Sequence, residues 1–294
     1  MRHIIPISGK DSLATAIVQT AFEPDLDYEF IYNDTRMELP ETYAWLELVE
    51  KTLGIQITRI GKSLEAIIYE KGILPSAQIR YCTAESKIFP MNDWLKKNNS
   101  TIYIGLRYDE ERAGLKPIKN QTVRYPLKEH HIGLSAVYDI CGSKNLMPPI
   151  FFWERLFNRV VEILQCSPKE IKKELGDKMI FDRAFAWRSR PNCFMCFYQR
   201  RYEWIGLLEF HPELFDKAEE IENKFKADER EKSFTWIQDL PLSELKNKRE
   251  HYFNKRAMET ASMIHKRLQG DLFASAMIDG LDLAQKSCGL FCGK

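Results

Sequence analysis

The chain opens with RHIIPISGKDSLA at residues 2–14, and this stretch decides how the rest of it is organised. The apolar residues 4–7 predict a buried strand, and the apolar run that begins at Leu13 predicts a helix. The polar residues 8–12 lie between them, where the first N–H groups of that helix have no partner within it. These N–H groups and the helix dipole favour a bound anion. The stretch therefore predicts a phosphate-binding turn, with an ordinary strand, turn and capped helix as the alternative.

The residue types within the turn suit a phosphate. Gly9 lets the backbone come close to the ligand, and Lys10 adds a mobile positive charge. Asp11 and Ser12 can cap the helix. The pattern is not that of the Walker loop, which requires GxxxxGK[ST], because only one glycine precedes the lysine. The residues expected to bind the phosphates are Ser8, Gly9, Lys10, Asp11 and Ser12.

The composition is that of a soluble protein, which we expect to be cytoplasmic. The 294 residues are 44% hydrophobic and 29% charged, and the net charge is +1. This balance gives no general field that would attract nucleic acid or a membrane. No run of 18 apolar residues and no signal-peptide pattern is present, so we expect no membrane partner. Seven cysteines in a reducing compartment indicate metal ligands or redox groups rather than disulfides.

Two different patterns divide the chain. Strand-like and helix-like segments alternate in residues 1–149, which predicts a nucleotide-binding α/β domain with a parallel sheet and helices on both faces. After Pro148 the apolar positions recur at three and four, so residues 150–294 predict a mainly helical region. Later strands are expected at 28–32, 55–60, 101–105 and 123–127, and helices at 41–53, 63–70, 84–97, 151–165, 168–175, 198–210, 213–226 and 249–268.

Other polar segments follow the predicted strands, and ligands of such sheets bind beyond the carboxyl ends of the strands. Asp34 and Thr35 follow the second strand, where the ribose or adenine of a nucleotide would lie. Arg80 and Lys87 flank the start of a helix and suit a second anion. The residues expected at this edge beside the turn are Asp34, Thr35, Arg80, Lys87, Gly105 and Arg107.

Four segments together resemble the phosphoadenosine-phosphosulfate reductase family, part of the adenine-nucleotide α-hydrolase (PP-loop) superfamily. They are SGKDS at 8–12, PETY at 40–43, RxCTxxxK at 80–87 and GxRxxE at 105–110, in the order and approximate spacing of that family. The resemblance covers residues 4–150. It implies the α-hydrolase fold and an adenine nucleotide whose phosphates rest on residues 8–12. One glycine of the family's SGGKDS loop is missing here.

Lys10 separates this chain from the true reductases of the family. Those enzymes usually lack the lysine, because they do not cleave an α–β phosphate bond. In the ATP pyrophosphatase branch the lysine neutralises the charge that develops as pyrophosphate leaves. The resemblance thus implies ATP with Mg²⁺ as cofactors. It also implies a set of catalytic residues: Lys10, Arg80, Lys87 and Arg107.

Two cysteine pairs predict a metal centre. Cys193 and Cys196 form a CxxC, and Cys288 and Cys292 form a CxxxC. Four thiolates suffice for a [4Fe–4S] cluster or a tetrahedral Zn²⁺. The aromatic surroundings favour the cluster, with Zn²⁺ as the second choice. The alternative without a metal is that the first pair consists of small core residues.

The predicted function is an ATP pyrophosphatase that adenylates an acceptor for sulfur incorporation, in DNA phosphorothioation or tRNA thiolation. Residues 197–215 resemble reductase-like proteins of phage and of DNA phosphorothioation systems. We therefore expect a nucleic-acid substrate, a sulfur-donor protein such as a cysteine desulfurase, and a homo-oligomer. One alternative is a reductase of adenylyl or phosphoadenylyl sulfate with Cys288 as nucleophile, because the tail CGL at 288–290 resembles the reductases' Glu-Cys-Gly-Leu-His. The other is a non-catalytic nucleotide sensor.

Overall fold

The computed structural model describes residues 1–96, 99–115, 120–148, 188, 191–225, 234–252, 254–255, 258 and 262. These residues belong to two compact units. Unit 1 consists of residues 1–67 and 81–148, and unit 2 consists of residues 68–80 together with the described residues from 188 onward. The domain boundary expected between residues 149 and 150 lies outside the described residues and stays a prediction.

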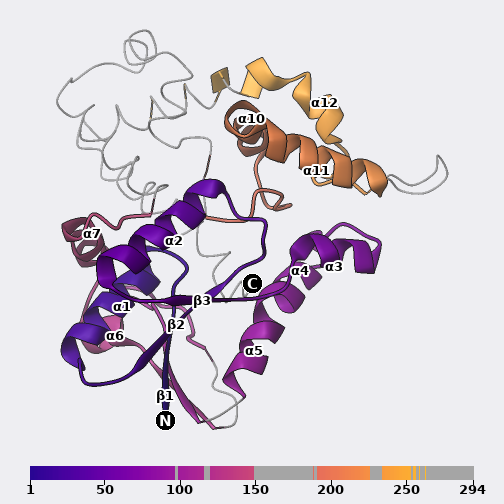
Figure 1. Ribbon diagram of the computed structural model, residues 1–294. Coiled ribbons are helices and arrows are strands. Elements are labelled where there is room, and N and C mark those ends of the chain that lie inside the picture. Colours follow the sequence, from indigo (N-terminus) through magenta and orange to yellow (C-terminus); the bar gives the residue numbers. More distant parts are fainter. Residues whose placement is uncertain are drawn as a thin grey trace. The chain divides into compact units, whose positions relative to one another are not determined.

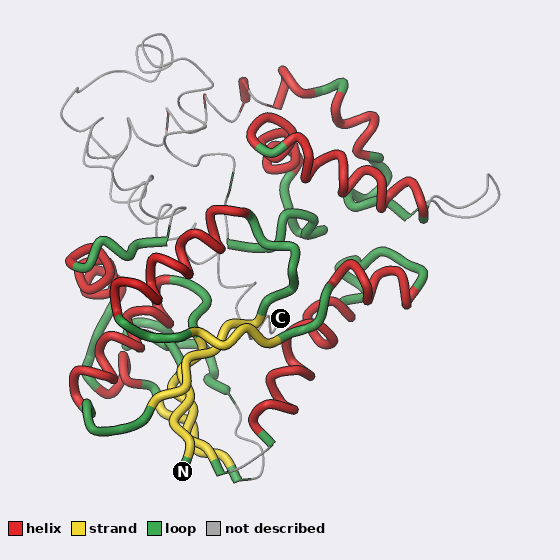
Figure 2. The backbone as a smooth tube through the Cα atoms, viewed as in Figure 1, coloured by secondary structure: helices red, strands yellow, loops and turns green. Residues whose placement is uncertain are grey.

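A parallel β-sheet forms the centre of unit 1 (Figures 1 and 2). Its order is β3-β2-β1-β4-β5, and each neighbouring pair is parallel. The predicted α/β class and parallel sheet are confirmed. The fifth strand lies earlier than the expected 123–127, because Pro126 already begins a helix there. The strands are β1 (Arg2–Pro6), β2 (Tyr28–Asn33), β3 (Ile57–Ile60), β4 (Ser100–Tyr103) and β5 (Gln121–Arg124).

The apolar run at the start of the chain forms the central strand because it can be buried on both faces. Ile4 and Ile5 of β1 point to opposite sides of the sheet, and both are fully buried. On one side, Ile4 packs with Ile31 of β2 and Ile102 of β4. A strand that is apolar on both faces needs a layer of helices on each side.

Helices supply those two layers in unit 1. Helices α1, α6 and α7 lie on one side of the sheet, and α5 packs on the other against the cluster around Ile4 (Figure 1). Helix α1 carries a stripe of buried residues that includes Leu13 and Ala14. The elements are α1 (Lys10–Phe22), α2 (Pro40–Leu53), α3 (Leu64–Lys71), α4 (Tyr81–Thr83), α5 (Phe89–Leu95), α6 (Pro126–Glu129) and α7 (Leu134–Ser143).

The single helix expected at residues 84–97 is interrupted by a π-helix, η1 (Ala84–Ile88), between α4 and α5. Pro90 explains the interruption. A proline has no N–H to donate to the carbonyl four residues earlier, and its ring clashes with that carbonyl. The N–H of Phe89 instead reaches back five residues to Ala84. The carbonyl of Ser86 accepts the N–H of Lys62 at 3.3 Å, which ties this helix to the loop after β3.

Unit 2 contains the helices α10 (Arg201–Phe210), α11 (Pro212–Lys224) and α12 (Leu242–Lys246). Helices α10 and α11 correspond to the helices expected at 198–210 and 213–226, whereas α12 was not expected. The helices expected at 151–165 and 168–175 lie outside the described residues. Only parts of the segment 249–268 are described. The fully buried Glu222 of α11 accepts the N–H groups of Trp236 and Leu242 at 2.9 and 2.7 Å. No helix of the described segments is long and apolar enough to cross a membrane.

Candidate functional site

The turn between β1 and α1, residues 8–12, is called the PP-loop below. The hydroxyl of Ser12 holds it closed, because Ser12 Oγ accepts the N–H groups of Ser8 and Gly9 at 2.8 and 3.0 Å. The same hydroxyl donates to the carbonyl of Gly9 at 2.9 Å. Gly9 has an extended backbone, and a Cβ placed on it would meet no atom within 4 Å. The chain itself therefore does not require a glycine at this position.

The order of the strands brings the end of β4 against the PP-loop. Strands β2 and β3 are added on one side of β1, and β4 and β5 on the other. The segments that follow the two neighbouring strands at such a change of side form the ligand-binding crevice of this fold class. Gly105, which follows β4, lies so close that a Cβ on it would be 2.7 Å from the carbonyl carbon of Asp11 and from the N of Ser12. Only a glycine fits there without moving the PP-loop.

Lys10 occupies the first turn of α1 and is only 3% exposed. Its Nζ lies 3.1 Å from Oδ2 of Asp11 and 5.8 Å from the centre of the Tyr138 ring. The thiol of Cys141 donates to the Lys10 carbonyl at 3.4 Å. Burial, and after it the charge of Asp11, raise the pKa of Cys141 to about 12. Cys141 is therefore a neutral supporting group of the PP-loop rather than a nucleophile.

Arg107 connects the PP-loop to the loop after β4. Its Nη1 donates to Oδ1 of Asp11 at 2.9 Å, and its Nε donates to Oδ1 of Asp109 at 3.0 Å. Glu110 accepts the backbone N–H of Arg107 at 3.1 Å and lies 3.6 Å from its guanidinium. The Arg107 side chain is almost fully buried among these three carboxylates. An anionic ligand can therefore bind the guanidinium of Arg107 only by displacing one of these carboxylates from it.

The carboxylate of Asp109 accepts hydrogen bonds from Arg107 and from the backbone of α7. Burial alone would raise its pKa, but the N–H of Leu134 at 3.1 Å and the guanidinium of Arg107 outweigh this effect. The pKa of Asp109 consequently lies below its ordinary value. Since Leu134 is the first residue of α7, this hydrogen bond anchors the loop of Arg107 to a helix N-terminus, where a negative charge is favoured.

The loop after β2 places Asp34 and Thr35 differently. Oδ1 of Asp34 accepts the N–H of Arg36 at 2.7 Å and the hydroxyl of Tyr43 at 2.9 Å. Burial, and then this bond to Asp34, raise the pKa of Tyr43. Thr35 is buried, and its hydroxyl donates to Glu38 at 2.9 Å. Thr35 thus stabilises its own loop, and the expected contacts of both residues with ribose or adenine stay predictions.

Lys87 lies on the π-helix η1, next to the Ser86 carbonyl that accepts the N–H of Lys62. Gly61 lies close to the loop after β2 and to η1. It has a φ of 126°, and a Cβ on it would lie 2.5 Å from the carbonyl oxygen of Asp34 and 3.1 Å from that of Ser86. The backbone of Gly61 therefore joins the loops that carry Asp34 and Lys87. π-Helices of this kind occur frequently at functional sites.

Arg80 belongs to unit 2 and contacts a different segment. Its guanidinium lies over the ring of Tyr198, 5.2 Å from the ring centre, and its buried Nε has no hydrogen-bond partner among the described residues. Tyr198 comes two residues after Cys196. The arginine of the RxCT segment is thus in contact with the chain that follows the CxxC.

The CxxC is a tight turn with two reduced cysteines. The N–H of Cys196 donates to the carbonyl of Cys193 at 3.2 Å, and the N–H of Gln199 donates to the carbonyl of Cys196 at 2.9 Å. The buried Arg188 lies beside the turn and donates to Oε1 of Gln199 at 2.8 Å. The described part of the chain contains no cluster of three or more His, Cys, Asp or Glu side chains that could hold a metal. Cys288 and Cys292 lie outside it.

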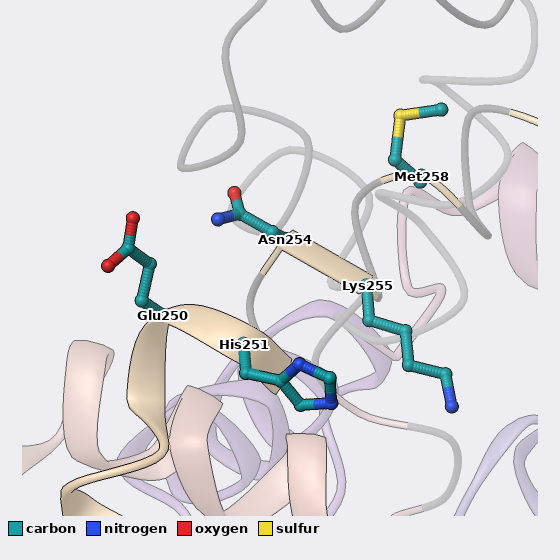
Figure 3. Close-up of a pocket in the computed structure, with 5 residues that line it drawn as sticks. All are labelled: Glu250, His251, Asn254, Lys255 and Met258. Carbon is teal, nitrogen blue, oxygen red and sulfur yellow. The ribbon is translucent and has the colours of Figure 1, made fainter.

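A separate pocket of about 520 Å³ lies in unit 2 (Figure 3). Its side chains come from one short segment, and none of them belongs to the residues predicted from the sequence. The lining residues are Glu250, His251, Asn254, Lys255 and Met258. Because the segments next to it in sequence lie outside the described residues, we assign it no function.

The structure thus brings the PP-loop, Gly105 and Arg107 into contact, and joins the loops of Asp34 and Lys87 through Gly61. The sequence reasoning missed Tyr138 beside Lys10, Gly61 and Arg188. A glycine directly after a predicted strand was an available signal for Gly61. No sequence pattern distinguishes Tyr138 or Arg188 from other residues of their types, because their roles depend on long-range packing.

Comparison with known proteins gives a family and two relatives. Residues 2–156 match the family described as the phosphoadenosine phosphosulfate reductase domain. The uncharacterized protein MJ0066 of Methanocaldococcus jannaschii is 29% identical over 236 residues, which are 78% of this chain and 42% of that protein. The uncharacterized protein MJ0973 of the same organism is 24% identical over 249 residues, which are 81% of this chain and 52% of that protein. The chain therefore spans about half the length of these relatives, or less.

Proposed function

The chain belongs to the phosphoadenosine phosphosulfate reductase domain family, and from this premise we propose that it is an ATP pyrophosphatase that adenylates an acceptor for sulfur incorporation. Membership of the family supports a nucleotide-utilising enzyme of sulfur chemistry. The observation that carries the finer proposal is Lys10, a buried cation in the first turn of a helix whose N-terminus is formed by the PP-loop.

The proposed reaction needs a positive charge at the place where Lys10 lies. An oxygen of the acceptor attacks the α-phosphorus of ATP, and the bond from that phosphorus to the oxygen bridging to the β-phosphate breaks. Pyrophosphate leaves with the electron pair of that bond. Lys10 and the N–H groups at the start of α1 stabilise the developing negative charge. A thiol reductant releases a hydrosulfide equivalent from the persulfide of the donor protein and is itself oxidised to a disulfide. The hydrosulfide then displaces AMP from the activated acceptor, a step that changes no oxidation state.

The charges around Arg107 fit ATP that arrives with Mg²⁺. This ion usually binds through one or two carboxylates and the phosphates of a nucleotide. Asp11 and Asp109 are carboxylates of this kind beside the PP-loop, and both are held by Arg107. We propose that Arg107 exchanges the carboxylate of Asp11 for a phosphate oxygen when the nucleotide binds, and that Lys87 binds a second anion.

We propose further that Cys193, Cys196, Cys288 and Cys292 hold a [4Fe–4S] cluster, with Zn²⁺ as the second choice. What supports this is that the two described cysteines, Cys193 and Cys196, lie in one turn and form no disulfide. A cluster there would supply a binding position for sulfur. Metal content after anaerobic purification tests this directly. We expect its loss in Cys193→Ser and Cys288→Ser and its retention in the control Cys166→Ser, and equal metal content in all three would refute the centre.

A nucleic acid is the acceptor we propose, with a sulfur-donor protein such as a cysteine desulfurase as partner and a homo-oligomer as the assembly. The support is the resemblance of residues 197–215 to proteins of DNA phosphorothioation systems. Incubation with ATP and Mg²⁺, radiolabelled cysteine, a desulfurase, a thiol reductant and either DNA or tRNA distinguishes the two acceptors. Label in neither polymer would contradict this part of the proposal.

Pyrophosphate release from ATP tests the central step. We expect Lys10→Ala to reduce it by about 10²- to 10³-fold, the usual effect of removing one contact to a developing charge. The control Lys51→Ala removes an exposed lysine of α2 and leaves the rate unchanged. If Lys10→Ala released pyrophosphate at the wild-type rate, the proposal would be wrong. If the wild type released none but formed sulfite from adenylyl sulfate and a thiol, it would be a reductase.

A further inference from the structure

Strand β2 ends in Asn33, whose buried side chain has no partner among the described residues. Asn33 is 6% exposed, and both its Oδ1 and its Nδ2 are buried without a hydrogen bond. A side-chain amide offers one acceptor oxygen and two donor hydrogens, and buried groups of this kind are nearly always paired. An amide that is buried and unpaired within the described part of the chain therefore calls for a partner that binds to it.

Asn33 lies at the same end of the strands as the PP-loop. Strand β2 is the parallel neighbour of β1, with Pro6 opposite Ile31, and the N–H of Ile7 donates to the carbonyl of Ile31 at 2.8 Å. Two residues beyond this pair the two chains reach Ser8 of the PP-loop and Asn33. Since neighbouring strands lie about 4.8 Å apart, the amide of Asn33 belongs to the ligand-binding end of the sheet, next to the place proposed for the phosphates.

The two polar residues that follow Asn33 are already paired within their own loop. The carboxylate of Asp34 accepts two hydrogen bonds through Oδ1. The hydroxyl of Thr35 donates to Glu38 at 2.9 Å. Of the three consecutive polar side chains at residues 33–35, only that of Asn33 is used by no group of the described chain. Asp34 and Thr35 thus shape the loop after β2, whereas Asn33 is available to a ligand.

We propose that Asn33 recognises the adenine base of the nucleotide whose phosphates lie on the PP-loop. This inference rests on the proposed function. A ligand that satisfies both atoms of the amide must present a donor beside an acceptor, and an edge of adenine does so. Its 6-amino group donates to Oδ1, and the neighbouring ring nitrogen, N1 or N7, accepts from Nδ2. A phosphate, which only accepts, or a cation, which binds only the oxygen, would leave one of the two atoms unpaired.

The stability of the ligand-free protein gives a first test. Leucine has nearly the shape of asparagine but carries no polar group, so Asn33→Leu removes a buried amide that has no partner. We expect its Tm without nucleotide to equal or exceed that of the wild type. A clear fall in Tm would mean that the chain itself supplies the partner of the amide, and the inference would be overturned.

The second test measures recognition of the base by calorimetric titration of the full-length chain with Mg²⁺ and two nucleotides. One is α,β-methylene-ATP, which cannot be cleaved between the α- and β-phosphates, and the other is the same compound with purine in place of adenine. Because purine lacks the 6-amino group, we expect the wild type to bind it about tenfold more weakly. Asn33→Leu should bind the two equally. The matched control Ser100→Ala removes another buried, unpaired polar group, at the opposite end of the strands, and should keep the wild-type ratio.

The outcomes separate this inference from the proposed function. If Asn33→Leu kept the wild-type ratio, or if the wild type bound both compounds equally, Asn33 would not read the base, and the inference would be overturned while the nucleotide site stood. A wild type that bound neither compound would overturn the proposed function as well. A 2′,3′-dideoxy analogue tests the ribose. If Asn33→Leu lost discrimination against this analogue but kept the base ratio, the amide would bind ribose hydroxyls and the adenine assignment would be wrong. If Asn33→Leu does not fold, Asn33→Ala replaces it and is judged by the same ratio.

Discussion

Gly105→Ala is the change that best tests how the PP-loop is positioned. A Cβ at residue 105 would lie 2.7 Å from the backbone of Asp11 and Ser12, about 0.7 Å short of the 3.4 Å at which ordinary contact begins. Both neighbours are backbone atoms, so neither can turn aside as a flexible side chain would. Overpacking of this kind costs about 1–3 kcal/mol. The PP-loop must also move by several tenths of an ångström, away from the geometry its N–H groups need for a phosphate.

Gly9→Ala is the matched control, because a Cβ there meets no atom of the chain within 4 Å and the backbone is extended. We expect Gly9→Ala to change the free energy of unfolding by less than about 0.5 kcal/mol. It should nevertheless weaken ATP binding, because the methyl group occupies space needed for close approach of a phosphate. Urea denaturation and calorimetric titration with ATP measure the two effects. A Gly105→Ala protein as stable as Gly9→Ala would refute the steric reasoning, and full ATP affinity in Gly9→Ala would refute the assignment of the PP-loop.

Two further predictions concern buried or paired carboxylates. Glu222→Gln should lower the free energy of unfolding, measured by urea denaturation, by about 1–3 kcal/mol. The reason is that Glu222 now accepts two N–H groups with its two oxygens, whereas an amide has one oxygen. The control Glu220→Gln changes an exposed carboxylate and should have little effect. Glu29→Gln removes the partner of Arg2, whose hydrogen bond lowers the pKa of Glu29 below its ordinary value of 4.5. A lowered carboxylate pKa stabilises the folded state at pH values above the unfolded pKa. At pH 7 the free energy of unfolding of the wild type should therefore exceed that of Glu29→Gln by less than about 1 kcal/mol. Thermal unfolding should show this difference vanishing as the pH falls through the lowered pKa.

The sheet could be predicted because each buried strand is a short run of mostly apolar residues in the sequence. Strands buried on both faces are mostly apolar, and residues 4–7 and 102–104 have that character. Once the strands are known to be parallel, the segments after them must meet at one edge. The contact between Gly105 and the PP-loop follows from this reasoning, although 93 residues separate Gly105 from Ser12.

Side-chain partners within that edge could not be predicted in the same way. Asp11 was expected as a helix cap, but its carboxylate binds Lys10 and, 96 residues away in sequence, Arg107. A carboxylate beside a helix start satisfies either role, and only the packing of β4 against β1 decides between them. For the same reason the sequence could not show that the hydroxyl of Thr35 donates to Glu38.

The π-helix has a local cause in the sequence, Pro90, but the group that binds the freed carbonyl could not be predicted from it. Pro90 lies inside the helix expected at residues 84–97, and a proline there must free the carbonyl of Ser86. The rule predicts a break or a kink, but it does not say which group uses the freed carbonyl. Here the N–H of Lys62 uses it, and the N–H of Phe89 reaches back five residues to Ala84 rather than four. The irregularity joins the segment of Lys87 to the loop after β3.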